Sequence, residues 1–119
     1  MINFAVEIEP IPQPRPRFGR GKIFEPARVS KYKLAVKAAA TAAMKGAIPF
    51  SSAVKAKIKL FRKFKATSRR FGDADNLAKA ILDACNGIIF SDDAQITKLT
   101  VEKIQSAVPR LEAEFEQEE

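Results

Sequence analysis

Apolar and polar residues alternate along two stretches in the first half of the chain, which is the pattern of a β-strand with one buried face. The first stretch covers residues 2–8, and prolines at positions 10 and 12 end it. The second covers residues 53–64. Its apolar positions are Val54, Ala56, Ile58 and Leu60, and the alternate positions are Lys55, Lys57 and Lys59. One face of this strand is therefore predicted to lie in the core and the other to carry a row of lysines.

Two further stretches have the composition and spacing of helices. The alanine-rich residues 26–45 are predicted to form a helix that Gly46 ends in the C′ position. Lys33 and Lys37 are expected on its solvent side, opposite a buried face made of Val29, Tyr32, Val36, Ala39, Ala40 and Ala43. A second helix is predicted to begin with Asp75 as its N-cap and to end at Gly87. Its buried positions are Leu77, Ile81, Ala84 and Ile88.

The end of the chain alternates again. Residues 100–104 and 110–119 are predicted to form a hairpin or meander around the turn between them. In the final strand, Leu111, Ala113 and Phe115 face inward, and Glu112, Glu114 and Glu116 face outward. If that strand neighbours the lysine strand, the two rows of opposite charge can form cross-strand pairs. The sequence therefore predicts one compact α+β domain over residues 1–119, with a mixed sheet of about four or five strands and two main helices on one face.

The composition excludes several kinds of chemistry. With one cysteine and no histidine, the chain has neither an internal disulfide nor a Cys/His zinc site. An imidazole base and a Ser-His or Cys-His nucleophile pair are excluded as well. Any catalysis must therefore depend on carboxylates, lysines, hydroxyls or a metal ion. No apolar run approaches a membrane span of about 20 residues and no secretory signal is recognisable, so a cytoplasmic location is predicted.

The charge is divided along the chain. Residues 1–72 hold 17 lysines and arginines and three acids, whereas residues 73–119 hold four bases and 11 acids. A strongly basic body suits a polyanionic partner such as nucleic acid, although a soluble basic protein with solvated loops has the same composition. The candidate DNA contacts are Arg15, Arg17, Arg20 and Lys22 in a segment rich in proline and glycine, Lys55, Lys57 and Lys59 on the lysine strand, and Arg69 and Arg70, with Arg62, Lys63 and Lys65 as further flanking bases.

Five aspartates lie in residues 72–96, "GDADNLAKAILDACNGIIFSDDAQI". Asp73 and Asp75 would point to the same side of an extended chain, where carboxylates make hard oxygen ligands. On the following helix, Lys79 and Asp83 continue from Asp75 at four-residue intervals. The segment lacks the glycine and glutamate positions of an EF-hand loop, so a magnesium site is the metal hypothesis that remains. Without a metal, the same residues are interpreted as a helix cap, a turn and a surface ion pair.

This segment resembles the signature of the RusA family of Holliday junction resolvases, which is found in bacteria, prophages and phages. The matching positions are Asp73, Asp75, Asn76, Leu77, Lys79, Asp83, Phe90, Asp92, Asp93, Ala94 and Gln95. The resemblance implies that Asp73, Asp75 and Asp93 are catalytic carboxylates that bind Mg²⁺, or Mn²⁺ in its place. It also implies that Lys79 is a catalytic lysine, and Asp83, Asp92 and Asn76 are interpreted as supporting residues.

The activity implied by the resemblance is a Mg²⁺-dependent endodeoxyribonuclease for DNA recombination and repair, which resolves four-way junctions by paired symmetric nicks. Members of the family are homodimers, and two active sites related by a two-fold axis suit a junction of the same symmetry. Two alternatives remain open. The chain can be a non-catalytic DNA-binding accessory protein of a phage or mobile element, or a nuclease for other branched or single-stranded DNA.

Overall fold

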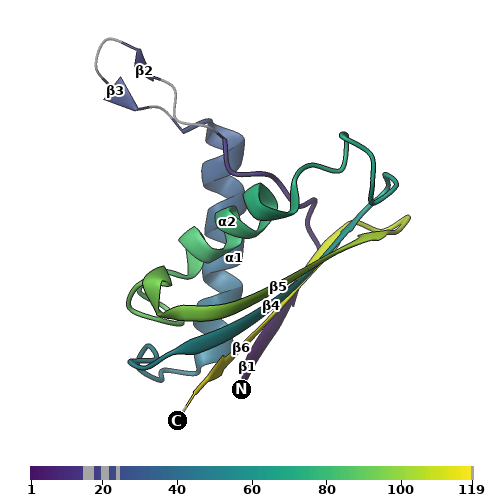
Figure 1. Cartoon of the computed structure of the whole chain (residues 1–119). Coiled ribbons are helices and arrows are strands. Elements are labelled where there is room, and N and C mark those ends of the chain that lie inside the picture. Colours follow the sequence, from purple (N-terminus) through teal and green to yellow (C-terminus); the bar gives the residue numbers. More distant parts are fainter. Residues whose placement is uncertain (15–17, 20–21, 24, 119) are drawn as a thin grey trace.

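A four-stranded mixed sheet forms the base of the molecule (Figure 1). The computed structural model describes residues 1–14, 18–19, 22–23 and 25–118. The strands are β1 (Ile2–Val6), β4 (Val54–Arg62), β5 (Ile96–Gln105) and β6 (Arg110–Gln117), in the order β1-β6-β4-β5. β4 and β5 are parallel, and the other neighbours are antiparallel. The predicted α+β class and mixed sheet are therefore confirmed.

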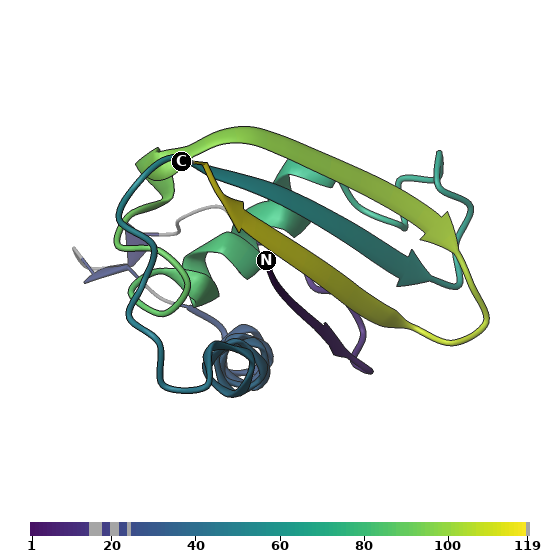
Figure 2. The ribbon, with the colours of Figure 1, turned by 90° about the horizontal axis from the view of Figure 1, so that it is seen from below.

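Two helices lie on one side of this sheet and leave the other side open (Figure 2). α1 (Ala27–Met44) packs against β1 and against α2 (Ala74–Cys85), and a short 3₁₀ helix, η1 (Asp93–Gln95), leads into β5. β4, α2 and β5 form a crossover unit, since parallel neighbours need a long connection. The core between the layers includes the fully buried side chains Val36, Ile58, Leu60, Leu77, Ile81, Leu111 and Phe115.

The end of α1 follows the prediction closely. Lys45 is the C-cap with φ 50°, and Gly46 has φ 80° in the C′ position. A positive φ is strained for most residues but costs glycine little, so the glycine stops the helix where the sequence indicates. Among the predicted inward positions, Val29, Tyr32, Val36 and Ala40 are buried.

The predicted hairpin between the last two strands is wrong. β5 and β6 lie on opposite sides of β4, because β5 pairs with β4 in parallel and β6 pairs with β4 and β1. The predicted neighbourhood of the lysine and glutamate rows is confirmed. The opposite residues in the register are Lys55 and Glu116, Lys57 and Glu114, and Lys59 and Glu112. Opposite charges in register favour β6 as the neighbour of β4.

The proline- and glycine-rich segment contributes two short strands, β2 (Phe18–Gly19) and β3 (Lys22–Ile23), which pair with each other. The predicted DNA contacts Arg15, Arg17 and Arg20 lie outside the described residues. In the described part of the chain, no helix is both long and apolar enough to cross a membrane.

Candidate functional site

α2 carries four of the predicted site residues along its length. Asp73 is the N-cap of the helix and Asp75 lies in its first turn, so the prediction of Asp75 as N-cap is wrong by two residues. The side chain of Asp73 makes no capping hydrogen bond. Both carboxylates are exposed and lie at the positive end of the helix dipole, which stabilises negative charge there. The start of α2 therefore presents two carboxylates that no capping bond occupies.

The turn before β5 holds a second pair of carboxylates. Asp92 is the N-cap of η1, and its Oδ1 accepts a hydrogen bond of 3.0 Å from the backbone N–H of Ala94. That hydrogen bond, followed by one from Asp93, lowers the pKa of the Asp92 carboxyl. The hydrogen bond to Asp92 raises the pKa of Asp93, and partial burial and the nearby Asp83 carboxylate add to the increase. The carboxyls of Asp92 and Asp93 therefore lie close enough to repel each other, and a bound cation would relieve that repulsion.

Lys79 and Asp83 face this acidic turn from α2. The ammonium of Lys79 lowers the pKa of Asp93, in opposition to the carboxylates around it. The simpler interpretation of Lys79 as a helix-surface ion pair fails, since among the described residues Asp83 pairs with Lys33 and Lys79 forms no ion pair. The charges of Lys79 and Asp83 on α2 are therefore near enough to affect Asp93 in the acidic turn.

Asp73 and Asp75 lie at the other end of the helix. Eight residues of α-helix separate Asp75 from Asp83, which corresponds to about 12 Å along the axis. Within residues 1–14, 18–19, 22–23 and 25–118, no three Asp, Glu, Cys or His side chains are close enough to hold one metal ion. The assignment of Asp73, Asp75 and Asp93 as metal ligands stays a prediction. The donor chemistry fits Mg²⁺, which prefers carboxylate oxygens and usually takes only one or two of them.

Gln95 fixes the acidic turn to the sheet through four hydrogen bonds of its side-chain amide. Its Oε1 accepts from the backbone N–H groups of Ser91 and Asp92, each at 2.9 Å. Its Nε2 donates to the carbonyls of Phe50 at 2.8 Å and Ser52 at 2.9 Å, just before β4. One amide thus joins the turn that carries Asp92 and Asp93 to the start of the neighbouring strand.

Replacing Gln95 with alanine is expected to release this turn. Ser91 and Asp92 are exposed, so their amide protons should exchange about tenfold faster without the Gln95 acceptor, and stability should fall by about 1–3 kcal/mol. Hydrogen exchange by NMR and thermal unfolding measure the two effects. Gln105→Ala is the matched control, because that amide makes one bond, to the Lys63 carbonyl. Equal exchange at Ser91 and Asp92 in Gln95→Ala and the unsubstituted protein would contradict this role.

Two partly buried cations, Arg62 and Lys103, hold the loop that leads to Asp73. Arg62 donates from Nη1 to the Phe71 carbonyl at 2.6 Å and from Nε to Oε1 of Glu9 at 2.7 Å. Lys103 donates to the Gly72 carbonyl at 2.8 Å, with its ammonium 5.1 Å from the centre of the Phe71 ring. Arg62 was expected among the bases that attract DNA, but its guanidinium is used inside the protein. These two residues position the start of α2.

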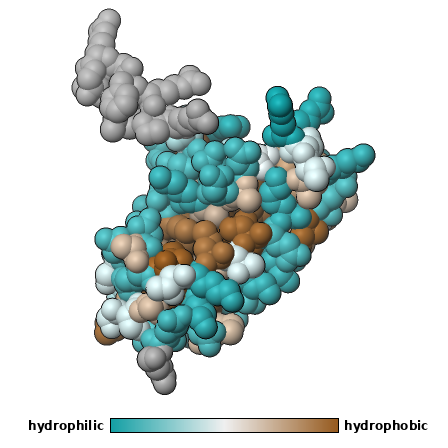
Figure 3. Space-filling model, viewed as in Figure 1, coloured by the Kyte–Doolittle hydropathy of each residue, from teal (hydrophilic) through white to brown (hydrophobic). Residues whose placement is uncertain are grey.

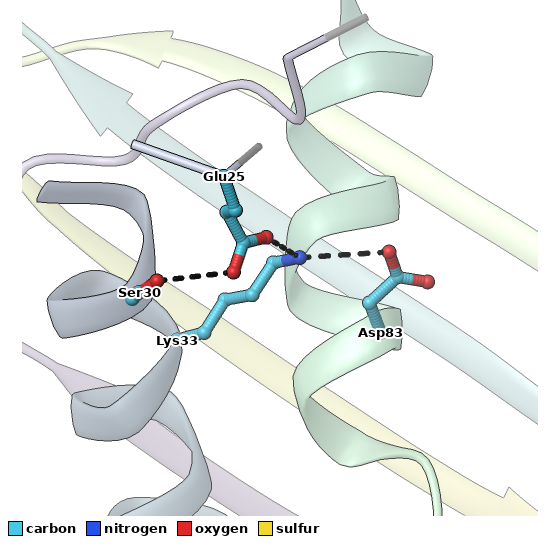
Figure 4. Close-up of polar contacts among 4 residues, drawn as sticks. All are labelled: Glu25, Ser30, Lys33 and Asp83. Atoms are coloured by element: carbon cyan, nitrogen blue, oxygen red, sulfur yellow. Dashed lines mark hydrogen bonds and ion pairs between the residues drawn. The ribbon is translucent and has the colours of Figure 1, made fainter. Parts of the chain in front are cut away.

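Lys33 is a third internal cation, and the prediction that it faces solvent is wrong. Its side chain is 13% exposed and joins α1 to α2, with Nζ 2.6 Å from Oε1 of Glu25 and 3.7 Å from Oδ2 of Asp83 (Figure 4). Ser30 donates to the other oxygen of Glu25. The hydrogen bond from Lys33 is the main reason that the pKa of Glu25 is lowered. Lys33 of α1 therefore forms an ion pair with Asp83, which also lies near enough to the acidic turn to affect Asp93.

The remaining predicted bases divide between two surfaces. Arg69 and Arg70 are exposed in the loop directly before Asp73, on the route to the helix N-terminus. Lys55, Lys57 and Lys59 line the open face of the sheet, away from α2, and stand opposite glutamates of β6. The predicted lysine row and the predicted carboxylates therefore do not share one surface. Asn76 contributes its backbone carbonyl, which accepts from the Gln13 N–H at 2.9 Å.

Sequence reasoning missed the tethering roles of Gln95, Arg62, Lys103 and Lys33. A signal existed for Gln95. Asp92 followed three residues later by glutamine is the pattern of a capping box, and the structure contains that box. The other three residues depend on contacts between distant segments, and lysine and arginine in a basic chain give no indication of which ones turn inward.

Fold and site together define a small α+β protein with a mixed sheet. Its candidate carboxylates lie at the start of α2, on α2 and in the turn before β5. A family model described as "Endodeoxyribonuclease RusA" matches residues 7–116, and the chain belongs to this family. Membership indicates a nuclease of the Holliday junction resolvase type. A similar chain is the "Uncharacterized protein YqaN" of Bacillus subtilis (strain 168), which is 31% identical over 93% of this chain and 92% of its own length.

Proposed function

We propose that this protein is a Mg²⁺-dependent endodeoxyribonuclease that resolves four-way DNA junctions as a homodimer, by paired symmetric nicks, in recombination and repair. The observation that carries the proposal is the family match over residues 7–116, which includes both carboxylate groups of the site. Mn²⁺ is expected to replace Mg²⁺, since both are octahedral and accept oxygen ligands. A cytoplasmic location follows from a substrate that is the DNA of the cell or its phage.

Asp73, Asp75 and Asp93 are the proposed ligands, and Asp92 and Asp83 support Asp93. When bound, Mg²⁺ would supply activation of the attacking water and stabilisation of charge at the phosphate. The Lys79 ammonium lowers the pKa of Asp93, whereas Asp92 and Asp83 raise it, so the carboxyl of Asp93 lies within reach of all three charged groups. Lys79 either orients the attacking water or neutralises charge that develops on the phosphate.

Arg69 and Arg70 are proposed to hold the DNA backbone at the start of α2. They are exposed and lie four and three residues before Asp73, so phosphates bound there would lie near the carboxylates. Lys55, Lys57 and Lys59 remain candidate contacts for a separate DNA arm on the open face of the sheet. Binding that depends on such bases weakens steeply as salt increases.

Incubation of a synthetic four-way junction with the protein and Mg²⁺ tests the proposal. The expected result is a pair of symmetric nicks that disappear in EDTA and in an Asp75→Asn variant. Asp75 is exposed, so its replacement by asparagine should leave the fold intact. Circular dichroism of the variant checks this.

Tight junction binding without nicks in Mg²⁺ or Mn²⁺ would reject the nuclease and favour the accessory protein. Faster cleavage of flaps or forks than of four-way junctions would instead favour a nuclease for other branched DNA. The same gel distinguishes these outcomes when all three substrates are included.

A further inference from the structure

β5 is a long edge strand with one side unpaired. In the sheet order β1-β6-β4-β5, it pairs with β4 and has no second neighbour in the described part of the chain. It is ten residues long, contains no proline, and is exposed from Thr97 to Thr100. Such an edge is a template for pairing with another chain. The opposite edge, β1, packs against α1.

The exposed part of β5 carries an apolar side chain on the helix side of the sheet. Leu99 is opposite the buried Ala56 in the register, so it points toward the layer that contains α2, yet it is 43% exposed. Val101, opposite the buried Ile58, points the same way and is partly buried. Figure 3 shows an apolar patch on the side of the molecule where α2 and β5 lie. The core therefore continues to the sheet edge without a cover.

We propose that β5 pairs antiparallel with β5 of a second copy of this chain, with Thr100 on the two-fold axis. In this register Leu99 lies opposite Val101 of the second copy on the helix side. Lys98 lies opposite Glu102 on the open side. Each contact occurs twice because of the two-fold axis. Apolar residues thus lie opposite apolar residues, and opposite charges lie opposite each other.

Neighbouring registers lose this match. Opposite residues in a two-fold pair must face the same side of the sheet, so the axis passes through a residue. An axis at Leu99 places Lys98 opposite Thr100, and an axis at Val101 places Leu99 opposite Lys103. The register shift between β4 and β5 lies at the start of the strand, before Lys98, so residues 98–102 remain regular.

This interface deepens the proposed function, since it rests on the homodimer included there and names its surface. The two sheets would join into one sheet of eight strands, and both copies of α2 would lie on the same face of it. Two identical sites on one face suit the two symmetric nicks of the proposed reaction.

Charge reversal tests the pairing. Lys98→Glu and Glu102→Lys each place like charges opposite one another twice, so each is expected to raise the dimer dissociation constant more than tenfold in sedimentation experiments. The double variant, Lys98→Glu with Glu102→Lys, restores opposite charges and is expected to return to within about threefold of the unsubstituted protein. Lys31→Glu on α1 is the matched control, with the same charge change on an exposed helix position and no expected effect. Circular dichroism verifies that each variant is folded.

An unsubstituted protein that stays monomeric at micromolar concentration would overturn the proposal. Single variants that dimerise normally, or a double variant that fails to recover, would also overturn it. Junction cleavage is measured separately. If dimerisation follows the charge pattern but the protein cuts no DNA, the nuclease is rejected and the interface is supported. If the protein cuts junctions but its single variants still dimerise normally, only the interface is rejected.

Discussion

Replacing Asp93 with asparagine is expected to reduce junction cleavage by about 10³-fold, the effect of losing a group that stabilises charge in the transition state. Asparagine has the same shape but no charge, so it cannot serve as an anionic ligand. The Asp93 hydrogen bond within the turn is made by its backbone carbonyl, which accepts from the Ile96 N–H, and its carboxyl lies near Asp92, Asp83 and Lys79. The fold should therefore survive. Single-turnover cleavage in Mg²⁺ measures the rate, and thermal unfolding measures the stability.

Asp92→Asn is the matched control for this prediction. An asparagine Oδ1 can still accept from the Ala94 N–H, so the cap of η1 should persist. The expected loss of cleavage is about tenfold, because Asp92 supports its neighbour and is not a proposed ligand. A larger loss in Asp92→Asn than in Asp93→Asn would reverse the roles given to the two residues.

The local elements of the fold could be predicted because their signals are local. The lysine strand alternates over seven residues, 54–60, and α1 ends at a glycine with positive φ. Local signals of this kind do not predict which strand pairs with which. β5 and β6 are neighbours in sequence, and a hairpin is the simplest connection between such strands. The crossover through α2 brings β5 to one side of β4, and this leaves β6 on the other.

The candidate site divides in a similar way. The residue types and their spacing on α2 were predictable, as was the acidic turn before β5. The proximity of Lys79, Asp83 and Asp93 depends on how the chain returns after α2, which is a tertiary property. The pairing of Asp73 and Asp75 assumed an extended chain, but α2 begins at Ala74 and places Asp75 inside the helix. Helix formation began earlier than the capping preference of Asp75 indicated.

The direction of charged side chains was the least predictable feature. Arg62, Lys33 and Lys103 turn inward because each meets an oxygen from a distant segment, such as the Phe71 carbonyl or the Asp83 carboxylate. Long aliphatic stems allow these residues to lie partly in the core with a charged end at a polar partner. A basic composition therefore overestimates the positive charge that is free to contact DNA.

Replacing Phe90 with alanine is expected to lower the free energy of unfolding by about 3–5 kcal/mol, the range for truncating a buried aromatic side chain. Phe90 is fully buried, and its ring centre is 5.9 Å from that of Phe115 on β6. Its carbonyl accepts from the Gly87 N–H at 2.8 Å, which closes the turn after α2. Because small domains are stable by only about 5–15 kcal/mol, this loss is a large share of the total. Denaturant unfolding measures it.

Phe61→Ala provides the control, since Phe61 lies partly exposed on the open face of the sheet, with the Arg110 guanidinium 5.4 Å from its ring centre. Its loss should cost about 1 kcal/mol or less. Phe90 also directly precedes the turn that carries Asp92 and Asp93. A variant that remains folded, such as Phe90→Leu, should therefore need more Mg²⁺ for half-maximal cleavage, because the turn loses its anchor in the core. A stability loss in Phe90→Ala no larger than in Phe61→Ala would contradict the anchoring role.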